Sequence, residues 1–173
     1  SSLVTPPFKT TIFVRNLTTI PNGFVAIAPY RAGFFSTPAY NQFNGLSSWI
    51  DLLSIHEYRH VLQYSKVMVK RKWSPEHILF GQGGWAVISF IVLPNWYWEG
   101  DAVKTETLYT HSGRGRVPGF YLQFPALRAM GNKYNFEKTR AGSFKDYVPN
   151  HYALGYHLTS YLQMNFGEPI WDQ

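Results

Sequence analysis

The sequence contains no cysteine, few charged residues and no long apolar run. Without cysteine the chain forms no disulfide and offers no thiolate to a metal, so a zinc site would have to use His, Asp or Glu. Charged residues make up only 15% of the 173 residues and apolar residues 45%, which is a globular composition. The most apolar stretch, Trp85 to Leu93, is much shorter than the roughly 20 residues of a membrane-spanning helix. It predicts a buried helix or strand, and no transmembrane segment in this chain.

The length suits a single domain with a core of its own. We expect a β-rich part over residues 1–45 and a mainly helical part over residues 46–173. The chain opens without Met and without the basic and apolar regions of a signal peptide. We therefore expect it to be an excerpt of a longer protein.

Three extended segments and a series of helices are predicted along the chain. Residues 10–16 and 24–28 are rich in β-branched and aromatic residues, and residues 32–36 give a third extended piece. Pro29 favours an edge position for the second strand, because proline cannot donate to a β-ladder. A helix of about 18 residues is expected from Trp49, capped by a serine before it. The fold class is therefore α+β, with a small mixed sheet followed by a mainly helical half.

The stretch S-I-H-E-Y-R-H, residues 54–60, carries a metal-binding pattern. His56 and His60 lie four residues apart and so share one face of the predicted helix, and Glu57 follows the first histidine directly. In hydrolytic zinc sites such histidines hold the ion, and the glutamate takes a proton from a water whose pKa the ion lowers. The competing interpretation is an ordinary helix with two satisfied histidines and a surface glutamate. Apolar residues on both sides of the motif predict burial, which makes that interpretation costly.

A third zinc ligand has to come from further along the chain. Glu99 is the best candidate, because Gly100 and Ala102 after it allow its helix to approach another closely. The remaining acidic and histidine candidates are Glu76, His77, Asp101, Glu106 and His111.

The segments H-E-Y-R-H and W-Y-W-E-G-D-A resemble those of the gluzincins, the zinc peptidases with H-E-x-x-H and a downstream glutamate ligand. The likeness extends to the aminopeptidase-N-like branch through Glu106, seven residues after Glu99, and through Tyr152-Ala153-Leu154-Gly155. In that branch the tyrosine stabilises the tetrahedral intermediate. The resemblance also implies that the strand at Phe24 to Ala28 binds the peptide backbone as an added strand.

The resemblance is closest to bacterial envelope proteins in which such a domain precedes a TolB-like β-propeller. Their segments are similar to residues 56–60, 98–102 and 112–120, and the likeness covers roughly residues 23–167. It implies a periplasmic, outer-membrane-associated or secreted location, and a β-propeller or other domain in the full-length chain.

Two features depart from the gluzincin pattern. His60 and Glu99 are 39 positions apart, about twice the gap in thermolysin and its relatives, so an insertion over residues 73–93 must fold out. The aminopeptidase signature G-x-M-E-N is absent, which leaves an endopeptidase or a specialised hydrolase as open as an aminopeptidase.

An oxyanion formed by attack on a carbonyl needs a hydrogen-bond donor beside it. Tyr152 is the first candidate, with His151 and His157 as competitors and a purely structural role as the alternative. Arg114 and Arg116 can hold an anionic group or a substrate carbonyl, or can simply form a solvated basic loop.

Asp101 and Glu106 can accept the second ring N–H of a zinc-binding histidine, or can cap or pair on their own helix.

The sequence therefore predicts a peptidase in which Zn²⁺ is held by His56, His60 and Glu99, with Glu57 as general base, acting on a peptide or protein substrate. The alternative is a non-enzymatic docking or assembly module of the same shape in a bacterial envelope complex. Nucleic acid is not an expected partner, because the basic residues behind the net charge of +6 are scattered and no stacking motif accompanies them.

Overall fold

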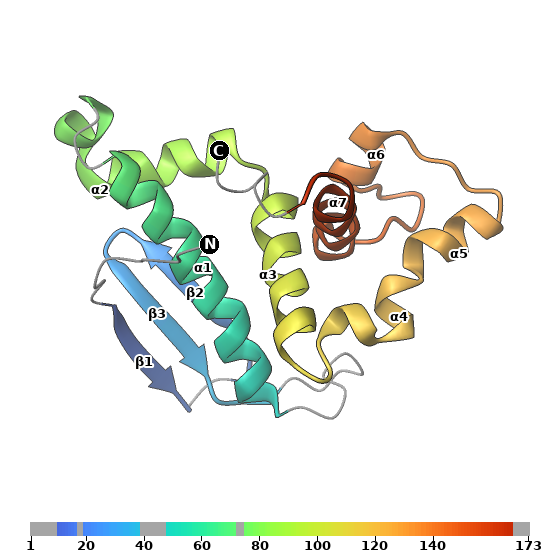
Figure 1. The fold of residues 1–173 in the computed structure, drawn as a ribbon, viewed down its shortest axis with the longest axis horizontal. Helices are drawn as coiled ribbons and strands as arrows, with labels where there is room; N and C mark the ends of the chain where they lie inside the picture. The colour runs from blue at the N-terminus through green and yellow to red at the C-terminus, as the bar shows by residue number, and fades with distance from the viewer. Residues whose placement is uncertain (1–9, 17–18, 39–47, 72–74, 168–173) are drawn as a thin grey trace. The chain divides into compact units, whose positions relative to one another are not determined.

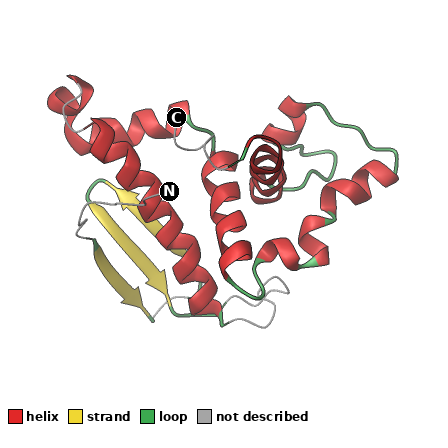
Figure 2. Cartoon of the chain, viewed as in Figure 1, coloured by secondary structure: helices red, strands yellow, loops and turns green. Residues whose placement is uncertain are grey.

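The chain has an α+β fold with a small mixed sheet and a mainly helical second half, as the sequence predicts. The computed structural model describes residues 10–16, 19–38, 48–71 and 75–167 (Figure 1). All three strands of the described part precede its helices (Figure 2).

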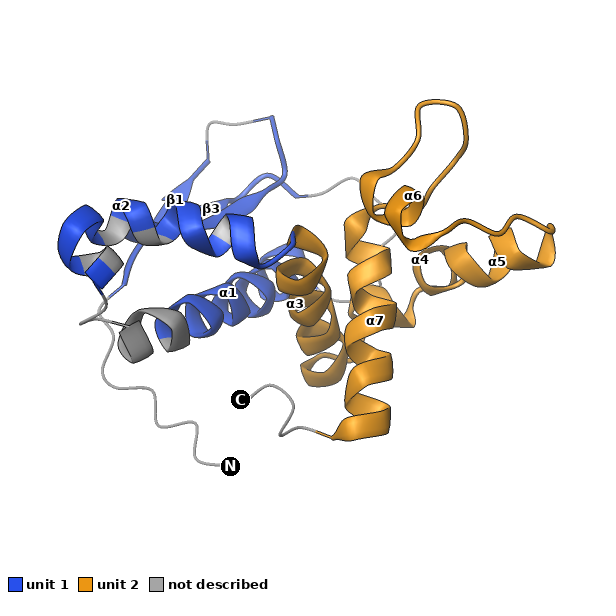
Figure 3. Cartoon of the chain, turned by 90° about the horizontal axis from the view of Figure 1, so that it is seen from above, with its two compact units in different colours: residues 1–41, 48–94 blue, residues 42–47, 95–173 orange. Residues whose placement is uncertain are grey.

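The chain divides into two compact units, coloured separately in Figure 3. The first consists of residues 1–41 and 48–94 and contains the sheet and two helices. The second consists of residues 42–47 and 95–173, and its described part is helical. The β-rich part expected over residues 1–45 holds all three described strands, but its unit also includes the first two helices.

The sheet of the first unit has the order β1-β3-β2. Strand β3 (Tyr30–Phe35) pairs in parallel with β1 (Thr11–Arg15) and antiparallel with β2 (Gly23–Ile27). Strand β2 therefore lies at an edge, as predicted, while Pro29 itself lies in the turn that leads from β2 to β3.

A glycine in the central strand brings aromatic rings together across the sheet. Gly33 is aligned with Phe13 on one neighbouring strand and with Phe24 on the other. A Cβ at Gly33 would lie 2.6 Å from the ring of Phe24 and 2.9 Å from that of Phe13. The two phenyl rings instead meet edge to face, with their centroids 5.7 Å apart. Such pairs stabilise a sheet beyond the apolar area they bury.

Helix α1 (Trp49–Arg71) lies across one face of this sheet (Figure 1). The hydroxyl of Ser48 accepts from the backbone N–H of Asp51, which confirms a serine cap, and the helix is longer than the sequence indicates. Tyr30 ties the sheet to the helix, because its hydroxyl donates to the carbonyl of Val61, 3.0 Å away. Burial raises the pKa of Tyr30 to about 12, so this donor keeps its proton.

Helix α2 (Pro75–Val92) contains the apolar run predicted to be buried, and here that prediction is wrong. The run is helical and continuous with residues 75–80 across a kink at Gly81 (φ 60°). Val87, Ile91 and Val92 are exposed, Ile91 by 78%. The only polar residue of the run, Ser89, is itself buried. The sequence pattern therefore marks no face that must point outward, and the composition suggests more burial than the fold provides. In the described part of the chain, no helix combines the length and the apolarity of a membrane span.

The second unit is built from short and long helices around α3 and α7. Its elements are α3 (Asn95–Tyr109), the 3-10 turn η1 (Arg114–Arg116), α4 (Pro118–Tyr121), α5 (Gln123–Ala129), α6 (Phe136–Ala141) and α7 (His151–Phe166). Helix α6 lies within a polar stretch of the sequence, between Gly131 and Pro149. The side chain of Asn135 caps it by accepting from the backbone N–H of Lys138, at 2.9 Å.

Helices α3 and α7 cross at two glycines. A Cβ on Gly100 would lie 2.1 Å from the backbone of Gly155, and a Cβ on Gly155 would lie 1.8 Å from the carbonyl oxygen of Trp96. The expectation that Gly100 permits close helix packing is therefore confirmed, with α7 as the partner. The crossing fixes the residues beside it, Glu99 on α3 and Tyr152 one turn before Gly155, within one rigid pair of helices.

We predict that Gly155→Ala destabilises the second unit by about 2 kcal/mol or more, because the added methyl group overlaps backbone atoms that cannot move independently. Chemical denaturation measures the change. Gly83→Ala is the control, since a Cβ at Gly83 meets nothing within 4 Å. Equal stability of Gly155→Ala and the wild type would contradict the close crossing.

Candidate functional site

The three residues of the histidine motif are buried on one side of α1. His56, Glu57 and His60 are 6%, 4% and 6% exposed. The imidazole centroids of His56 and His60 are 4.9 Å apart with their planes at 85°. A helix places residues four apart on neighbouring turns of one face, so the local geometry follows directly from the sequence spacing.

Gln63 orients the ring of His60, and sequence reasoning missed it. The Oε1 atom of Gln63 lies 2.8 Å from Nδ1 of His60. An amide oxygen only accepts, so Nδ1 carries a proton, and in the neutral ring the lone pair then lies on Nε2. Tyr64 also stacks on the His60 ring, with centroids 6.0 Å apart. The signal was present in the sequence, because a glutamine three residues after a histidine lies within its reach on a helix.

Glu57 lies against the start of the edge strand β2. A Cβ on Gly23 would be 2.9 Å from Oε1 of Glu57 and 2.8 Å from a methyl carbon of Leu53. Only glycine fits there, and it brings the backbone of β2 close to the carboxylate. The need for glycine at position 23 could not be recognised from the sequence, because an Asn-Gly pair is typical of an ordinary turn.

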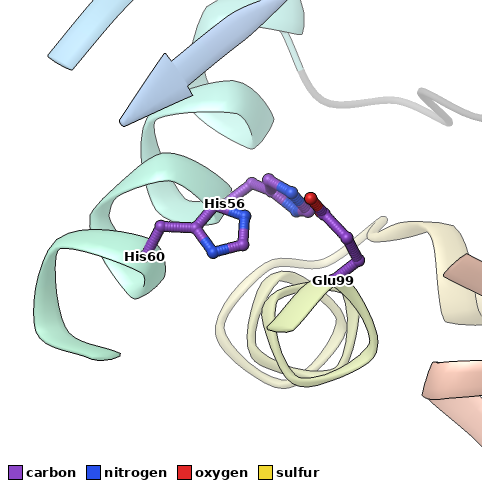
Figure 4. Close-up of side chains that lie close together, drawn as sticks. All are labelled: His56, His60 and Glu99. Atoms are coloured by element: carbon purple, nitrogen blue, oxygen red, sulfur yellow. The ribbon is translucent and has the colours of Figure 1, made fainter. Parts of the chain in front are cut away.

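Glu99 lies just after the first turn of α3 and is the third member of a possible metal-binding group. His56, His60 and Glu99 each offer one ligand atom, and these atoms all lie within 4.8 Å of one another. Figure 4 shows the three side chains close together. Among the residues that the structure describes, this is the one group of three or more His, Asp or Glu side chains that meets that distance. It consists of the three ligands that the sequence predicts.

The two acidic residues after Glu99 have basic partners in their own unit. Asp101 lies 3.4 Å from Nζ of Lys104, and both side chains are buried. Glu106 accepts hydrogen bonds from Arg114, at 2.7 Å from Nε and 2.8 Å from Nη2. The prediction that Asp101 or Glu106 accepts a ring N–H from a zinc-binding histidine stays a prediction.

Tyr152 lies on the first turn of α7, with the guanidinium of Arg114 above its ring. The distance from Cζ of Arg114 to the ring centroid is 5.0 Å. His151 lies beside the same ring, with centroids 4.5 Å apart. Arg116, the last residue of the 3-10 turn η1 that contains Arg114, is exposed. The roles predicted for these side chains toward a substrate stay predictions.

His157 has a structural contact of its own. Its Nε2 lies 3.0 Å from the carbonyl oxygen of Tyr121, so the ring is neutral with the proton on Nε2 or charged. Burial lowers the pKa of His157, and the hydrogen bond to Tyr121 only partly opposes this. The neutral form is therefore favoured, and it ties α7 to the end of α4.

Comparisons with known protein families, with curated proteins and with solved structures found no match for this chain. The site is therefore interpreted from its own residues.

We predict that His157 makes the protein less stable in mild acid. Its folded-state pKa lies below the ordinary value of 6.5, so the unfolded chain binds the proton more readily, and stability falls as the pH drops below 6.5. His157→Gln keeps a donor to the Tyr121 carbonyl and should flatten that fall. Denaturation at pH 7.5 and pH 5.5 measures it, with exposed His111→Gln as control. An unchanged pH dependence in His157→Gln would rule out this contribution.

Proposed function

We propose that this protein is a zinc-dependent peptidase with His56, His60 and Glu99 as its metal ligands. The observation that carries the proposal is the convergence of these three ligand atoms, together with the burial of Glu57, which directly follows His56 in the sequence. Two imidazoles and one carboxylate leave a position open for water, as catalytic zinc sites require.

The chemistry of the donor set fits zinc better than the harder divalent cations. Calcium and magnesium prefer all-oxygen ligands, whereas imidazole suits zinc. The bond between His60 and Gln63 leaves Nε2 of His60 with its lone pair, and such outer partners usually accompany metal-binding histidines. When bound, zinc would lower the pKa of a coordinated water toward neutrality and polarise a substrate carbonyl.

Glu57 is the general base in this proposal. Glu57 directly follows His56 in the sequence and is 4% exposed. A buried carboxylate is costly unless its surroundings favour the ionised form, and a divalent cation nearby supplies that. Glu57 would take a proton from the attacking water and deliver it to the leaving amine.

The substrate would lie along β2. This strand is an edge of the described sheet and starts against the carboxylate of Glu57 through Gly23. Extended peptides bind exposed sheet edges by adding a strand, because the edge offers unpaired backbone donors and acceptors. Tyr152 would then donate its hydroxyl to the oxyanion.

The wider setting rests on the resemblance to envelope proteins. We infer a periplasmic, outer-membrane-associated or secreted location and a further domain, such as a β-propeller, in the full-length chain.

A docking module without hydrolytic activity is the second candidate. The exposed apolar side chains of α2, among them Ile78, Leu79 and Phe80, favour it, because contiguous apolar surface often marks a binding face. In a module, replacing Glu57 would leave function intact, and this separates the two candidates.

We predict that Glu57→Gln lowers the cleavage of casein or of a mixed peptide library at least about a hundredfold, because the amide cannot take a proton from water. Zinc content, measured by mass spectrometry, should stay at the wild-type level. Glu137→Gln is the control, since Glu137 is exposed on α6.

Full activity of Glu57→Gln would contradict the assigned base. Failure of the zinc-loaded wild type to cleave any of these substrates would favour the docking module.

We predict that Gln63→Leu weakens zinc binding roughly 10- to 100-fold, because the His60 ring loses the acceptor that fixes its tautomer. Competition with a fluorescent chelator measures the dissociation constant. Gln63→Glu keeps an acceptor and should bind zinc at least as tightly as the wild type. Equal affinity of Gln63→Leu and the wild type would show that this contact does not support the metal.

A further inference from the structure

The arginine turn, residues 113–116, contacts both α3 and α7 in the second unit. It includes η1 and follows the end of α3 after a short bend. From the sequence alone, Arg114 and Arg116 could either contact the substrate or belong to a solvated basic loop. The structure shows that one of them, Arg114, forms an ion pair with the buried Glu106 and is only partly exposed.

Glu106 anchors Arg114 through three hydrogen bonds. Oε1 of Glu106 accepts from Nε at 2.7 Å and from the backbone N–H of Arg114 at 3.0 Å, and Oε2 accepts from Nη2 at 2.8 Å. The carboxylate of Glu106 is 2% exposed. A two-pronged contact of this kind fixes the plane of the guanidinium as well as its position.

The backbone of the arginine turn makes two further hydrogen bonds, one to α3 and one to the residue that follows it. The N–H of Gly115 donates to the hydroxyl of Thr107 on α3 at 3.0 Å, and the N–H of Gly113 donates to that of Thr110 at 2.9 Å. A Cβ on Gly113 would lie 2.4 Å from Cα of Thr107. The turn therefore sits directly on the helix.

The other side of the turn contacts α7 through two tyrosines one helical turn apart. The guanidinium of Arg114 lies over the ring of Tyr152, and Gly115 lies under the ring of Tyr156. A Cβ on Gly115 would come within 2.4 Å of the Tyr156 ring, so Gly115 lets the turn approach. The hydroxyl of Tyr156 also reaches the carbonyl oxygen of Gly115, at 3.4 Å.

Arg114 keeps its positive charge because Glu106 stabilises the protonated guanidinium. Burial alone would lower the pKa of Arg114, but the hydrogen bonds and charge of Glu106 outweigh this and raise it, with smaller contributions from Tyr152 and Glu99. The guanidinium therefore stays a cation over the face of Tyr152, where its attraction to the ring is strong because solvent is partly excluded.

We propose that Arg114 is a positioning residue, which holds the ring of Tyr152 in the orientation needed to donate its hydroxyl to the substrate oxyanion. The inference rests on the proposed peptidase function. Glu106 fixes Arg114, and Arg114 fixes Tyr152, so the order of a catalytic donor on α7 is set from α3. The exposed Arg116 has no part in this chain of contacts.

The first test reads the Tyr152 ring without using activity. 3-Fluorotyrosine is placed at position 152, and its ¹⁹F resonance is recorded. Arg114→Met alone leaves Glu106 buried without its cation, so the main variant is Arg114→Met with Glu106→Gln. We expect a shifted and broadened resonance, because the ring loses its cation and gains freedom. Arg140→Met, which breaks an exposed ion pair with Glu137, should leave the resonance unchanged.

The second test is kinetic. The double variant should lower kcat roughly tenfold or more with little change in KM, since a misplaced donor weakens the transition state and not substrate binding. In a Tyr152→Phe background the same change should have almost no further effect. Arg114→Lys, with Glu106 intact, should recover part of kcat.

The outcomes separate the two claims. An unmoved ¹⁹F resonance, or an equal loss of kcat in the Tyr152→Phe background, would overturn the positioning role while leaving the peptidase proposal intact. A moved resonance with no hydrolysis by the zinc-loaded wild type would show that Arg114 orders the ring but that the peptidase function is wrong.

Discussion

Burial of two imidazoles and a carboxylate on adjacent turns of one helix is the constraint on which the proposed site depends. His56, Glu57 and His60 are shielded from water, and each has polar atoms whose desolvation must be compensated. Gln63 offsets part of this cost, because its Oε1 accepts a hydrogen bond from Nδ1 of His60. A divalent cation ligated by the histidines and Glu99 would further offset this desolvation, and Glu57 is proposed to act on water bound to it. The same burial that costs stability thus supports the interpretation as a metal centre.

Glycines allow close backbone contacts beside the residues of the proposed site. Gly23 admits the backbone of β2 to the side chain of Glu57, and the Gly100–Gly155 crossing holds α3 against α7. At these positions any larger residue would push apart the elements that carry the functional groups. Close backbone approach is a general use of glycine, and here it falls beside the candidate base in one unit and beside Glu99 in the other.

The sequence predicted the parts of the structure that depend on short spacings. The β-branched segments became strands, Pro29 correctly indicated an edge strand, and the spacing of His56 and His60 placed them on one face of α1. The grouping of Glu99 with the histidines was predicted from its neighbours Gly100 and Ala102 and from the gluzincin resemblance. The features that were not predicted depend on contacts between residues further apart in the sequence, or on residues whose type gives no sign of their role.

The ion pair of Glu106 with Arg114 bridges eight positions around a turn, and no periodicity predicts it. Gln63 was overlooked because a glutamine on a helix is usually a surface residue. The exposure of Val87, Ile91 and Val92 on α2 could not be recognised from composition, because these residues are apolar while the polar Ser89 beside them is buried.

X-ray absorption spectroscopy at the zinc edge of the purified protein tests the central claim most directly. The account predicts about one zinc per chain, with a first shell of nitrogen and oxygen ligands at about 2.0–2.2 Å that includes two imidazoles. In His60→Ala one imidazole should be lost together with most of the zinc. A wild-type protein that binds no zinc after reconstitution, or a first shell that is the same in His60→Ala, would contradict it.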